Sequence, residues 1–112
     1  MLEIFYTNQF KKDFKKAKKQ GKNLEKLKEV LVLLQEQQTL PPKYKDHALT
    51  GNYIGTRECH IEPDWLLIYK IDGDKLILTL ARIGSHSELF RWIGKILQIN
   101  KKTLLNEPTP KS

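Results

Sequence analysis

The chain contains a single cysteine, Cys59, among its 112 residues. One cysteine excludes an internal disulfide and a cysteine-rich zinc site, and it fits a protein of the reducing cytoplasm. No apolar run approaches the roughly 20 residues of a membrane-spanning helix, and the N-terminus shows no signal-peptide pattern. We therefore expect a cytoplasmic protein with no membrane partner, built around one modest core.

Acidic residues are also few relative to basic ones. The chain has 20 Lys and Arg against 13 Asp and Glu, which gives a net charge of +7. Such a surplus is typical of proteins that bind a polyanion, such as nucleic acid, an acidic protein or an anionic membrane surface. A lysine-rich surface that only keeps the protein soluble is the alternative, so charge alone favours nucleic acid only slightly.

The first 40 residues predict a short strand and two amphipathic helices. Residues 2–6 read as the strand, and Thr7 or Asn8 is a candidate helix cap. Two phenylalanines and an alanine then share one helical face, lysines occupy the rest, and Gly21 is a candidate stop. Asn23 caps a second helix with a leucine stripe, which we expect the prolines of residues 39–42 to end.

The second half predicts strands and one more helix. Strand-like pieces cover residues 56–61, 65–71 and 75–83, after an irregular segment rich in proline, glycine and polar residues. Ser85 and Glu88 then match a capping box, which predicts a C-terminal helix. We therefore predict an α+β domain: an N-terminal helical hairpin packed on a small, mainly antiparallel sheet of about four strands.

The last two strands give a register. A two-residue turn at Asp72-Gly73 pairs Ile71 with Asp74 and sets Trp65 opposite Leu80. A turn shifted by one residue keeps the same faces together, whereas a three-residue loop moves one strand's set to the other face.

With the two-residue turn, Arg82 shares a face with Trp65 and lies at the open end of the hairpin. His86 follows in the first turn of the next helix, and His60 reaches the same end across the turn that contains Asp64. These five residues therefore meet at one sheet end. Arg57, further back on its strand, is a candidate outer cation for RNA.

Two imidazoles and a guanidinium suit phosphodiester cleavage in RNA. The reaction needs a base for the 2′-hydroxyl, positive charge for the phosphorane and an acid for the departing 5′-oxygen. Histidine serves as either proton partner near neutral pH, and arginine presents a planar fork to phosphate. The start of the last helix adds backbone N–H groups that favour an anion.

Each of these residues also has a structural interpretation. Arg82 can simply pair with Asp64, and Trp65 is more often a core residue than a platform for bases. The "HIE" triplet lacks the downstream cysteines of zinc deaminases. Three histidines with Asp64 lack tight zinc-ligand spacing, so we expect no metal.

The segments YKDHALTGNYIGTRECHIEPDWLLIYK (44–70) and ARIGSHSELF (81–90) together resemble the YafQ-type toxins of the RelE superfamily, from bacterial toxin–antitoxin systems. The similarity spans residues 1–90, and its motifs agree in order and spacing. The resemblance implies a ribosome-dependent endoribonuclease that cuts mRNA in the decoding site without a metal or other cofactor. It implies two partners: a cognate antitoxin and the ribosome with its mRNA.

Matched residue by residue, the family's site falls on His47, His60, Asp64, Trp65, Arg82, His86 and Phe90. By this similarity His47 is the base candidate, His86 the acid candidate and Arg82 the phosphate clamp. The other members position these groups, hold RNA or shape the pocket.

The chain departs from such toxins after residue 90, where they usually stop. We expect a toxin domain at 1–90 and an extension at 91–112, first helical and then disordered. An extension folded back over His86 would occlude the site, so an inactive RNA- or antitoxin-binding module is one alternative. A toxin of the related ParE branch, which poisons DNA gyrase, is another, although such a binder has no use for the histidine set.

Overall fold

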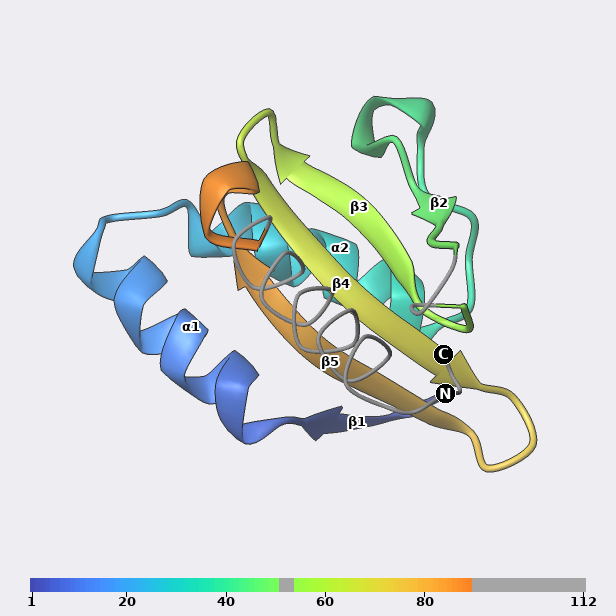
Figure 1. Cartoon of the computed structure of the whole chain (residues 1–112). Coiled ribbons are helices and arrows are strands. Elements are labelled where there is room, and N and C mark those ends of the chain that lie inside the picture. Colours follow the sequence, from blue (N-terminus) through green and yellow to red (C-terminus); the bar gives the residue numbers. More distant parts are fainter. Residues whose placement is uncertain (51–53, 90–112) are drawn as a thin grey trace, which may run out of the picture.

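The computed structural model describes residues 1–50 and 54–89 (Figure 1). Its elements are β1 (Glu3–Tyr6), α1 (Asn8–Lys19), α2 (Leu24–Gln35), the 3-10 helix η1 (Pro42–Tyr44), β2 (His47–Ala48), β3 (Arg57–Glu62), β4 (Trp65–Asp72) and β5 (Ile77–Gly84). A helical turn follows at 86–89. The rest of the predicted C-terminal helix, Phe90 and the extension all lie outside the described residues.

The strands form one five-stranded sheet in the order β1-β5-β4-β3-β2. β1 runs parallel to β5, and the other neighbours are antiparallel. The predicted α+β class and mainly antiparallel sheet are confirmed. The additional strand is β2, which lies in the segment expected to be irregular and pairs with β3 over two residues only.

The first helix has the ends that its sequence predicts. The Thr7 hydroxyl oxygen accepts a hydrogen bond from the Phe10 amide at 2.9 Å, and the same hydroxyl donates to the carbonyl of Ala81 at 2.8 Å. At the other end Gly21 adopts φ +72°, and the Lys22 amide donates to the carbonyl of Ala17. This is a Schellman ending, which needs a left-handed residue after the helix.

The second helix ends earlier than its sequence suggests. It stops at Gln35 rather than at the prolines of residues 39–42. Gln37 takes the left-handed conformation, φ 58°, and the amide of Gln38 donates to the carbonyl of Leu33. The helix thus closes with a Schellman-type turn that uses glutamine, which carries no sequence signal for this role.

The predicted two-residue hairpin turn is wrong. β4 pairs with β5 from Asp72↔Ile77, so residues 73–76 connect the strands. The Asp72 carboxylate accepts hydrogen bonds from the amides of Asp74 and Lys75, each at 3.1 Å, which stabilises the longer connection. The positive φ lies at Leu76 rather than at a glycine of the turn.

A β-bulge shifts the register again further along these strands. Tyr69 pairs with Leu80 but Ile68 pairs with Arg82, so Ala81 is the extra residue. Leu66 pairs with Gly84 on β5, so Trp65 does not lie opposite Leu80 as predicted. Arg82 pairs with Ile68, which packs on the other face of the sheet from Trp65, so Arg82 does not share the face of the tryptophan as predicted.

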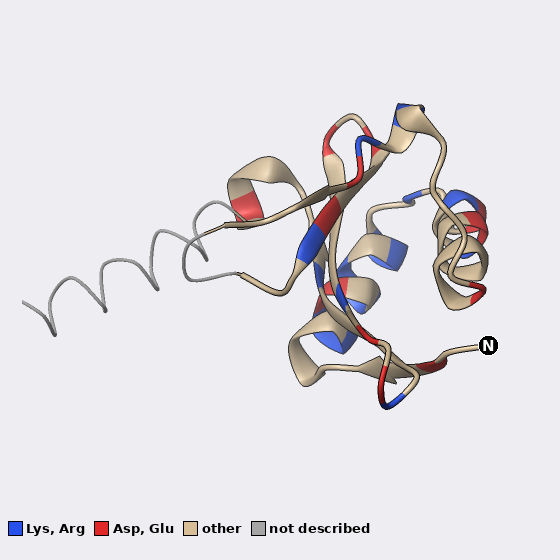
Figure 2. Cartoon of the chain, turned by 90° about the vertical axis from the view of Figure 1, so that its right-hand side faces the viewer, with Lys and Arg blue, Asp and Glu red and all other residues tan. Residues whose placement is uncertain are grey.

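The central strand β4 has five consecutive buried residues because both faces of the sheet are covered. On one face the main core contains residues of both helices, with α1 along β5 and α2 against β3. The turn at 86–89 lies on the other side of the sheet from α2 (Figure 2), where Leu89 packs with Leu66 and Ile68. Among the described residues, no helix has the length and apolar character needed to cross a membrane.

Candidate active site

The tight turn between β3 and β4 positions the first catalytic candidates. Glu62 pairs with Trp65, so Pro63 and Asp64 form the turn. The Asp64 carboxylate oxygen Oδ1 accepts two hydrogen bonds from His86, one from its backbone amide at 2.9 Å and one from Nδ1 at 2.7 Å. The turn therefore fixes both the start of the last helix and the orientation of its imidazole.

This contact also determines which nitrogen of His86 is free. The hydrogen bond from the backbone amide of His86, together with that from its imidazole, lowers the pKa of Asp64, so the carboxylate is ionised and can only accept. The proton in the shared contact must then lie on Nδ1 of His86. Nε2 remains the nitrogen that can exchange a proton with a substrate.

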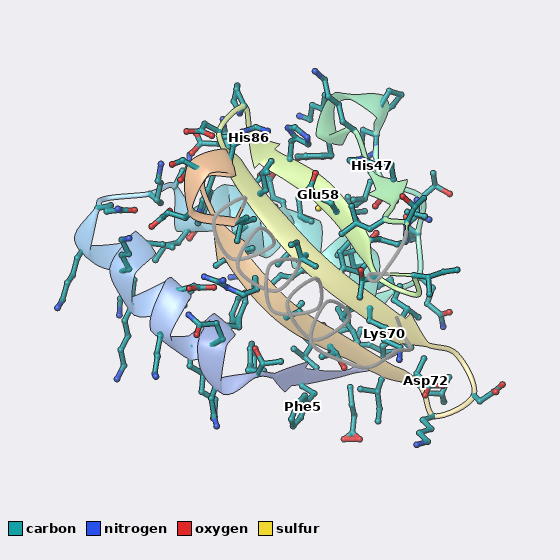
Figure 3. All side chains as sticks on the ribbon, viewed as in Figure 1. Phe5, His47, Glu58, Lys70, Asp72 and His86 are labelled. Atoms are coloured by element: carbon teal, nitrogen blue, oxygen red, sulfur yellow. The ribbon has the colours of Figure 1, made fainter. Side chains whose placement is uncertain are left out.

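Three imidazoles form a row at this end of the sheet. The ring of His60, on β3, lies 5.4 Å from the ring of His86 and 6.5 Å from the ring of His47, measured between centroids. Figure 3 shows His47 and His86 at the same end of the sheet, far from Asp72 at the hairpin tip. The predicted convergence of His60, Asp64 and His86 is therefore present, and His47 joins it.

His47 has acceptors at both ring nitrogens. Nδ1 lies 2.8 Å from the carbonyl oxygen of Lys45, which can only accept, so Nδ1 carries a proton. Nε2 lies 3.4 Å from a carboxylate oxygen of Glu58, the residue opposite His47 in the β2–β3 pair. Both ring nitrogens of His47 therefore face acceptors.

A polar network anchors the residue before His47. Asp46 accepts a hydrogen bond from the Arg57 guanidinium at 3.0 Å and another from the Tyr69 hydroxyl. Burial and this carboxylate raise the pKa of Tyr69, and the hydrogen bond to Asp46 is the main cause that raises the pKa of Arg57. Arg57 thus holds the residue before β2 in place, and its role as an outer cation for RNA stays a prediction.

A cavity of about 510 Å³ opens beside the imidazole row. Both His60 and His86 line it, together with Glu29 and Glu62. Its cations are the lysines at positions 26, 43 and 45. Phosphate would therefore meet imidazoles and ammonium groups here, rather than a guanidinium.

Arg82 is not among the residues that line this cavity. Its guanidinium donates to both carboxylate oxygens of Asp13 on α1, at 2.8 and 3.0 Å, and the Ile83 amide donates to the same carboxylate. The side chains of Arg82 and Asp13 are 11% and 9% exposed. Arg82 thus joins α1 to β5, and its predicted function as the phosphate clamp stays a prediction without geometric support.

Two further expectations change with the structure. Trp65 is 1% exposed and belongs to the main core, so it presents no face for a base to stack on. The start of the last helix, expected to bind an anion, already has carboxylates: Asp64 accepts from the His86 amide and Glu88 from the Ser85 amide. The predicted capping box of Ser85 and Glu88 is confirmed.

The sequence interpretation missed Asp13, Asp46 and the three cavity lysines. Two of these lysines flank Tyr44 in the stretch that leads to His47, which is a local signal that basic charge accompanies the histidine. Asp13 gave no signal, because it is one acid within a lysine-rich helix and its partner lies 69 residues further along the chain.

Comparison with known proteins finds relatives of this chain among bacterial toxins. The family model described as "Bacterial toxin of type II toxin-antitoxin system, YafQ" matches residues 2–91. The mRNA interferase toxin YafQ of Escherichia coli K12 is 47% identical over 89 residues, which cover 79% of this chain and 95% of the relative. mRNA interferases are endoribonucleases, and the enzyme class expected from the sequence is confirmed.

Solved structures give the same result. The crystal structure of the E. coli DinJ-YafQ complex matches with a TM-score of 0.73 at 43% identity, covering 80% of this chain and 99% of that one. The crystal structure of a metal-bound toxin from Helicobacter pylori matches with a TM-score of 0.76 at 47% identity and the same coverage. Within residues 1–50 and 54–89, no cluster of three His, Cys, Asp or Glu side chains fits a metal ion.

The match over residues 2–91 and the 47% identity to a relative that it covers almost completely lead to one conclusion. This chain belongs to the YafQ family of bacterial toxins from type II toxin–antitoxin systems.

Proposed function

We propose that this toxin is a ribosome-dependent endoribonuclease that cleaves translated mRNA in the cytoplasm by metal-independent general acid–base chemistry. The observation that carries the proposal is the row of imidazoles beside a lysine-lined cavity, with one imidazole fixed by a carboxylate. General acid and base groups each contribute about 10²–10⁴-fold to such reactions.

His86 is suited to be the acid. In its imidazolium form the ring holds one proton on Nδ1 against Asp64 and a second on Nε2, which it can give to the departing 5′-oxygen. Because Asp64 also holds the backbone amide, the ring and the main chain are fixed by the same group. Such prior orientation lowers the entropy cost of proton transfer.

His60 is suited to be the base. Unlike His47 and His86, it has no hydrogen-bond partner among the described residues, only ring contacts with its two neighbours. A neutral imidazole with an open nitrogen can accept the 2′-hydroxyl proton. This assigns to His47 a supporting role, whereas the family resemblance made it the base candidate.

The lysines of the cavity supply charge for the phosphorane. Lys43 and Lys45 lie on either side of buried Tyr44, and Lys26 lies across the cavity on α2. Lys26 is also 3.5 Å from Glu62, and Glu29 adds a second acid to the lining. Because these acidic side chains offset part of the positive charge of the lysines, the cavity should bind free RNA weakly. This supports dependence on a ribosome that delivers the message.

The partner that neutralises the toxin is a cognate antitoxin. Crystal structures of E. coli YafQ include complexes with DinJ, and the net charge of +7 here favours an acidic protein partner.

Toeprinting of a translated message tests the proposal. Wild-type protein is expected to give new, ribosome-dependent 5′ ends, and His86→Ala is expected to give none. Because the His86 side chain is 55% exposed, the free energy of unfolding should change by no more than about 0.5 kcal/mol. Purified protein should cut the same RNA poorly when ribosomes are omitted.

Two results would contradict the proposal. Cleavage by His86→Ala at the wild-type rate would show that His86 is not the general acid. Efficient cutting of naked RNA by the wild type would show that cleavage does not depend on the ribosome.

A further inference from the structure

The cavity beside the imidazole row contains acidic side chains as well as cations. Glu29 of α2 and Glu62 at the end of β3 line it, together with two imidazoles and three lysines. Carboxylates repel phosphate, so these acids do not bind the RNA backbone. A glutamate in a cavity that takes RNA is favourable for binding only where it meets a hydrogen-bond donor.

The two glutamates differ in their surroundings. A carboxylate oxygen of Glu62 lies 3.5 Å from the ammonium of Lys26, and the Glu62 side chain is 30% exposed. The carboxylate of Glu29 is exposed and has no hydrogen bond or ion pair with any other residue in the described part of the chain. The charge of Glu62 is thus matched by a lysine, whereas Glu29 keeps its acceptor capacity for a ligand.

Glu29 also lies on the side of its helix that borders the cavity. It follows Lys26 by three residues, and residues three apart share one face of an α-helix. Both line the cavity, while Glu25 and Lys28 of the same helix do not. The cavity volume of about 510 Å³ lies within the range of about 300–1,000 Å³ that is typical of small-ligand pockets. A nucleotide held at the imidazoles can therefore direct its base toward α2.

The bases of RNA differ in what they offer to a carboxylate. Adenine, cytosine and guanine each carry an exocyclic amino group, which presents N–H donors at the edge of the base. Uracil has no such group, and its one ring N–H lies between two carbonyl oxygens that repel a carboxylate. Unstacked bases of single-stranded RNA are recognised through hydrogen bonds at these edges. An ionised glutamate, which can only accept, therefore selects against uracil.

We propose that Glu29 is a specificity-determining residue that accepts a hydrogen bond from the exocyclic amino group of a base next to the cleaved bond. This inference rests on the proposed ribonuclease function and names a feature of its substrate. Messages with an amino-bearing base at that position are cleaved faster than messages with uracil. Glu29 has no hydrogen bond to His60 or His86, so it selects the substrate and takes no part in proton transfer.

Two other interpretations of Glu29 give different results. A carboxylate that is only solvated would leave base selection unchanged when it is removed. A carboxylate that pairs with a cation of the antitoxin would matter only in the toxin–antitoxin complex. A test on the ribosome without antitoxin therefore separates base recognition from both.

Base analogues on the ribosome test the assignment with the full chain. Synthetic messages carry adenosine or purine riboside, which lacks the 6-amino group, at either position flanking the cleaved bond, and single-turnover cleavage of the labelled message gives the rate. At one of these positions the wild type should cleave the adenosine message about tenfold faster than its analogue. In Glu29→Ala the two rates should differ by less than about twofold, because the group that senses the amino group is gone.

Two further variants are matched to this change. Glu25→Ala removes an equally exposed carboxylate from the same helix, outside the cavity, and should keep the wild-type ratio of the two rates. Glu29→Gln keeps an oxygen that accepts but loses the charge, and should retain a ratio of about threefold. Damage to the fold would slow cleavage of both messages by the same factor and would leave the ratio unchanged.

The outcomes separate this inference from the function on which it rests. Cleavage by Glu29→Ala with the wild-type ratio, or a wild type that does not distinguish the two messages at either position, would overturn the role of Glu29 alone. Equal loss of the ratio in Glu29→Ala and Glu25→Ala would also overturn it, because the charge of α2 rather than a base contact would then set the selectivity. A wild-type chain that cleaves none of the messages on the ribosome would overturn the proposed function.

Discussion

Arg82 and His86 are four residues apart in the sequence, yet their surroundings are opposite. The Arg82 side chain is 11% exposed and donates to both oxygens of a carboxylate that is itself almost buried. His86 is 55% exposed and keeps one ring nitrogen open toward a cavity. The Arg82 guanidinium, which is paired with a carboxylate, stabilises the fold, whereas the open ring nitrogen of His86 can exchange a proton. Nearness to the site along the chain does not make a cation available to the substrate.

The imidazoles of the row are expected to contribute unequally to cleavage, and substitution of His60 should have the largest effect on the rate. His60→Gln should lower the rate of cleavage of translated mRNA by about 10²–10⁴-fold, because it removes the base. His47→Gln should lower the rate by about tenfold or less, since that imidazole already has acceptors at both nitrogens. Single-turnover primer extension measures both rates. A larger loss for His47→Gln would return the base role to His47.

The ion pair of Arg82 with Asp13 is tested by its contribution to the free energy of unfolding. Asp13→Ala removes the carboxylate that accepts two hydrogen bonds from the almost buried Arg82 guanidinium, and should lower the free energy of unfolding by about 3–5 kcal/mol. Urea denaturation measures the change. The double variant Asp13→Leu, Arg82→Met should recover part of it, because an apolar pair replaces the ion pair at little cost while the Ile83 amide still lacks its acceptor.

The control for this measurement is Asp74→Ala, which removes an exposed carboxylate from the hairpin connection. It should change the free energy of unfolding by about 0.5 kcal/mol or less. A loss below about 1 kcal/mol for Asp13→Ala would mean that this ion pair contributes less to stability than its burial indicates. Arg82 would then again be a candidate for the phosphate clamp.

Local signals predicted local structure well. The caps at Thr7 and Asn23, the stop at Gly21 and the capping box at Ser85 all depend on side chains that contact amides within a few residues. His60, Asp64 and His86 also met as expected, because one turn and one strand end determine their positions. Contacts of this kind are encoded in short stretches of sequence.

The wrong predictions concern positions that are determined by contacts with side chains or strands outside the local sequence. An Asp-Gly pair predicts a tight turn, but the Asp72 side chain stabilises a longer connection, and a bulge at Ala81 then changes the register before Arg82. Nothing near Arg82 indicates that its counter-charge is Asp13 on the first helix. The two-residue strand β2 was not predicted for the same reason. Asp46, the residue before it, is held by Arg57 and Tyr69 from other strands.

A smaller effect should follow from the charge of Asp64 alone. Asp64→Asn keeps an oxygen that accepts from the His86 amide and ring but removes the negative charge. Because Asp64 is well exposed, the lost pair should lower the cleavage rate by about fivefold or less. Asp64→Ala removes both hydrogen bonds and should cost more. Equal rates for the two variants would show that the charge, and not the orientation, carries the contribution of Asp64.

The smallest effect concerns the start of the helix that carries His86. The Lys16 ammonium, with the Ser85 amide, lowers the pKa of Glu88 from 4.5 to about 2. Between these values the unfolded chain binds more protons, so this contribution to stability is complete above pH 4.5 and is lost as the pH falls toward 2.

Glu88→Gln should therefore cost about 1 kcal/mol of unfolding free energy at pH 6 and almost nothing near pH 2, as measured by urea denaturation at the two pH values. Ser87→Ala, outside the capping box, is the control and should show no such pH dependence. A cost for Glu88→Gln that is the same at both pH values would mean that the shape of the capping box, and not the carboxylate charge, stabilises this turn. In that case the anchor of His86 would not weaken in acid, and any acid loss of cleavage would have to arise in the imidazole row itself.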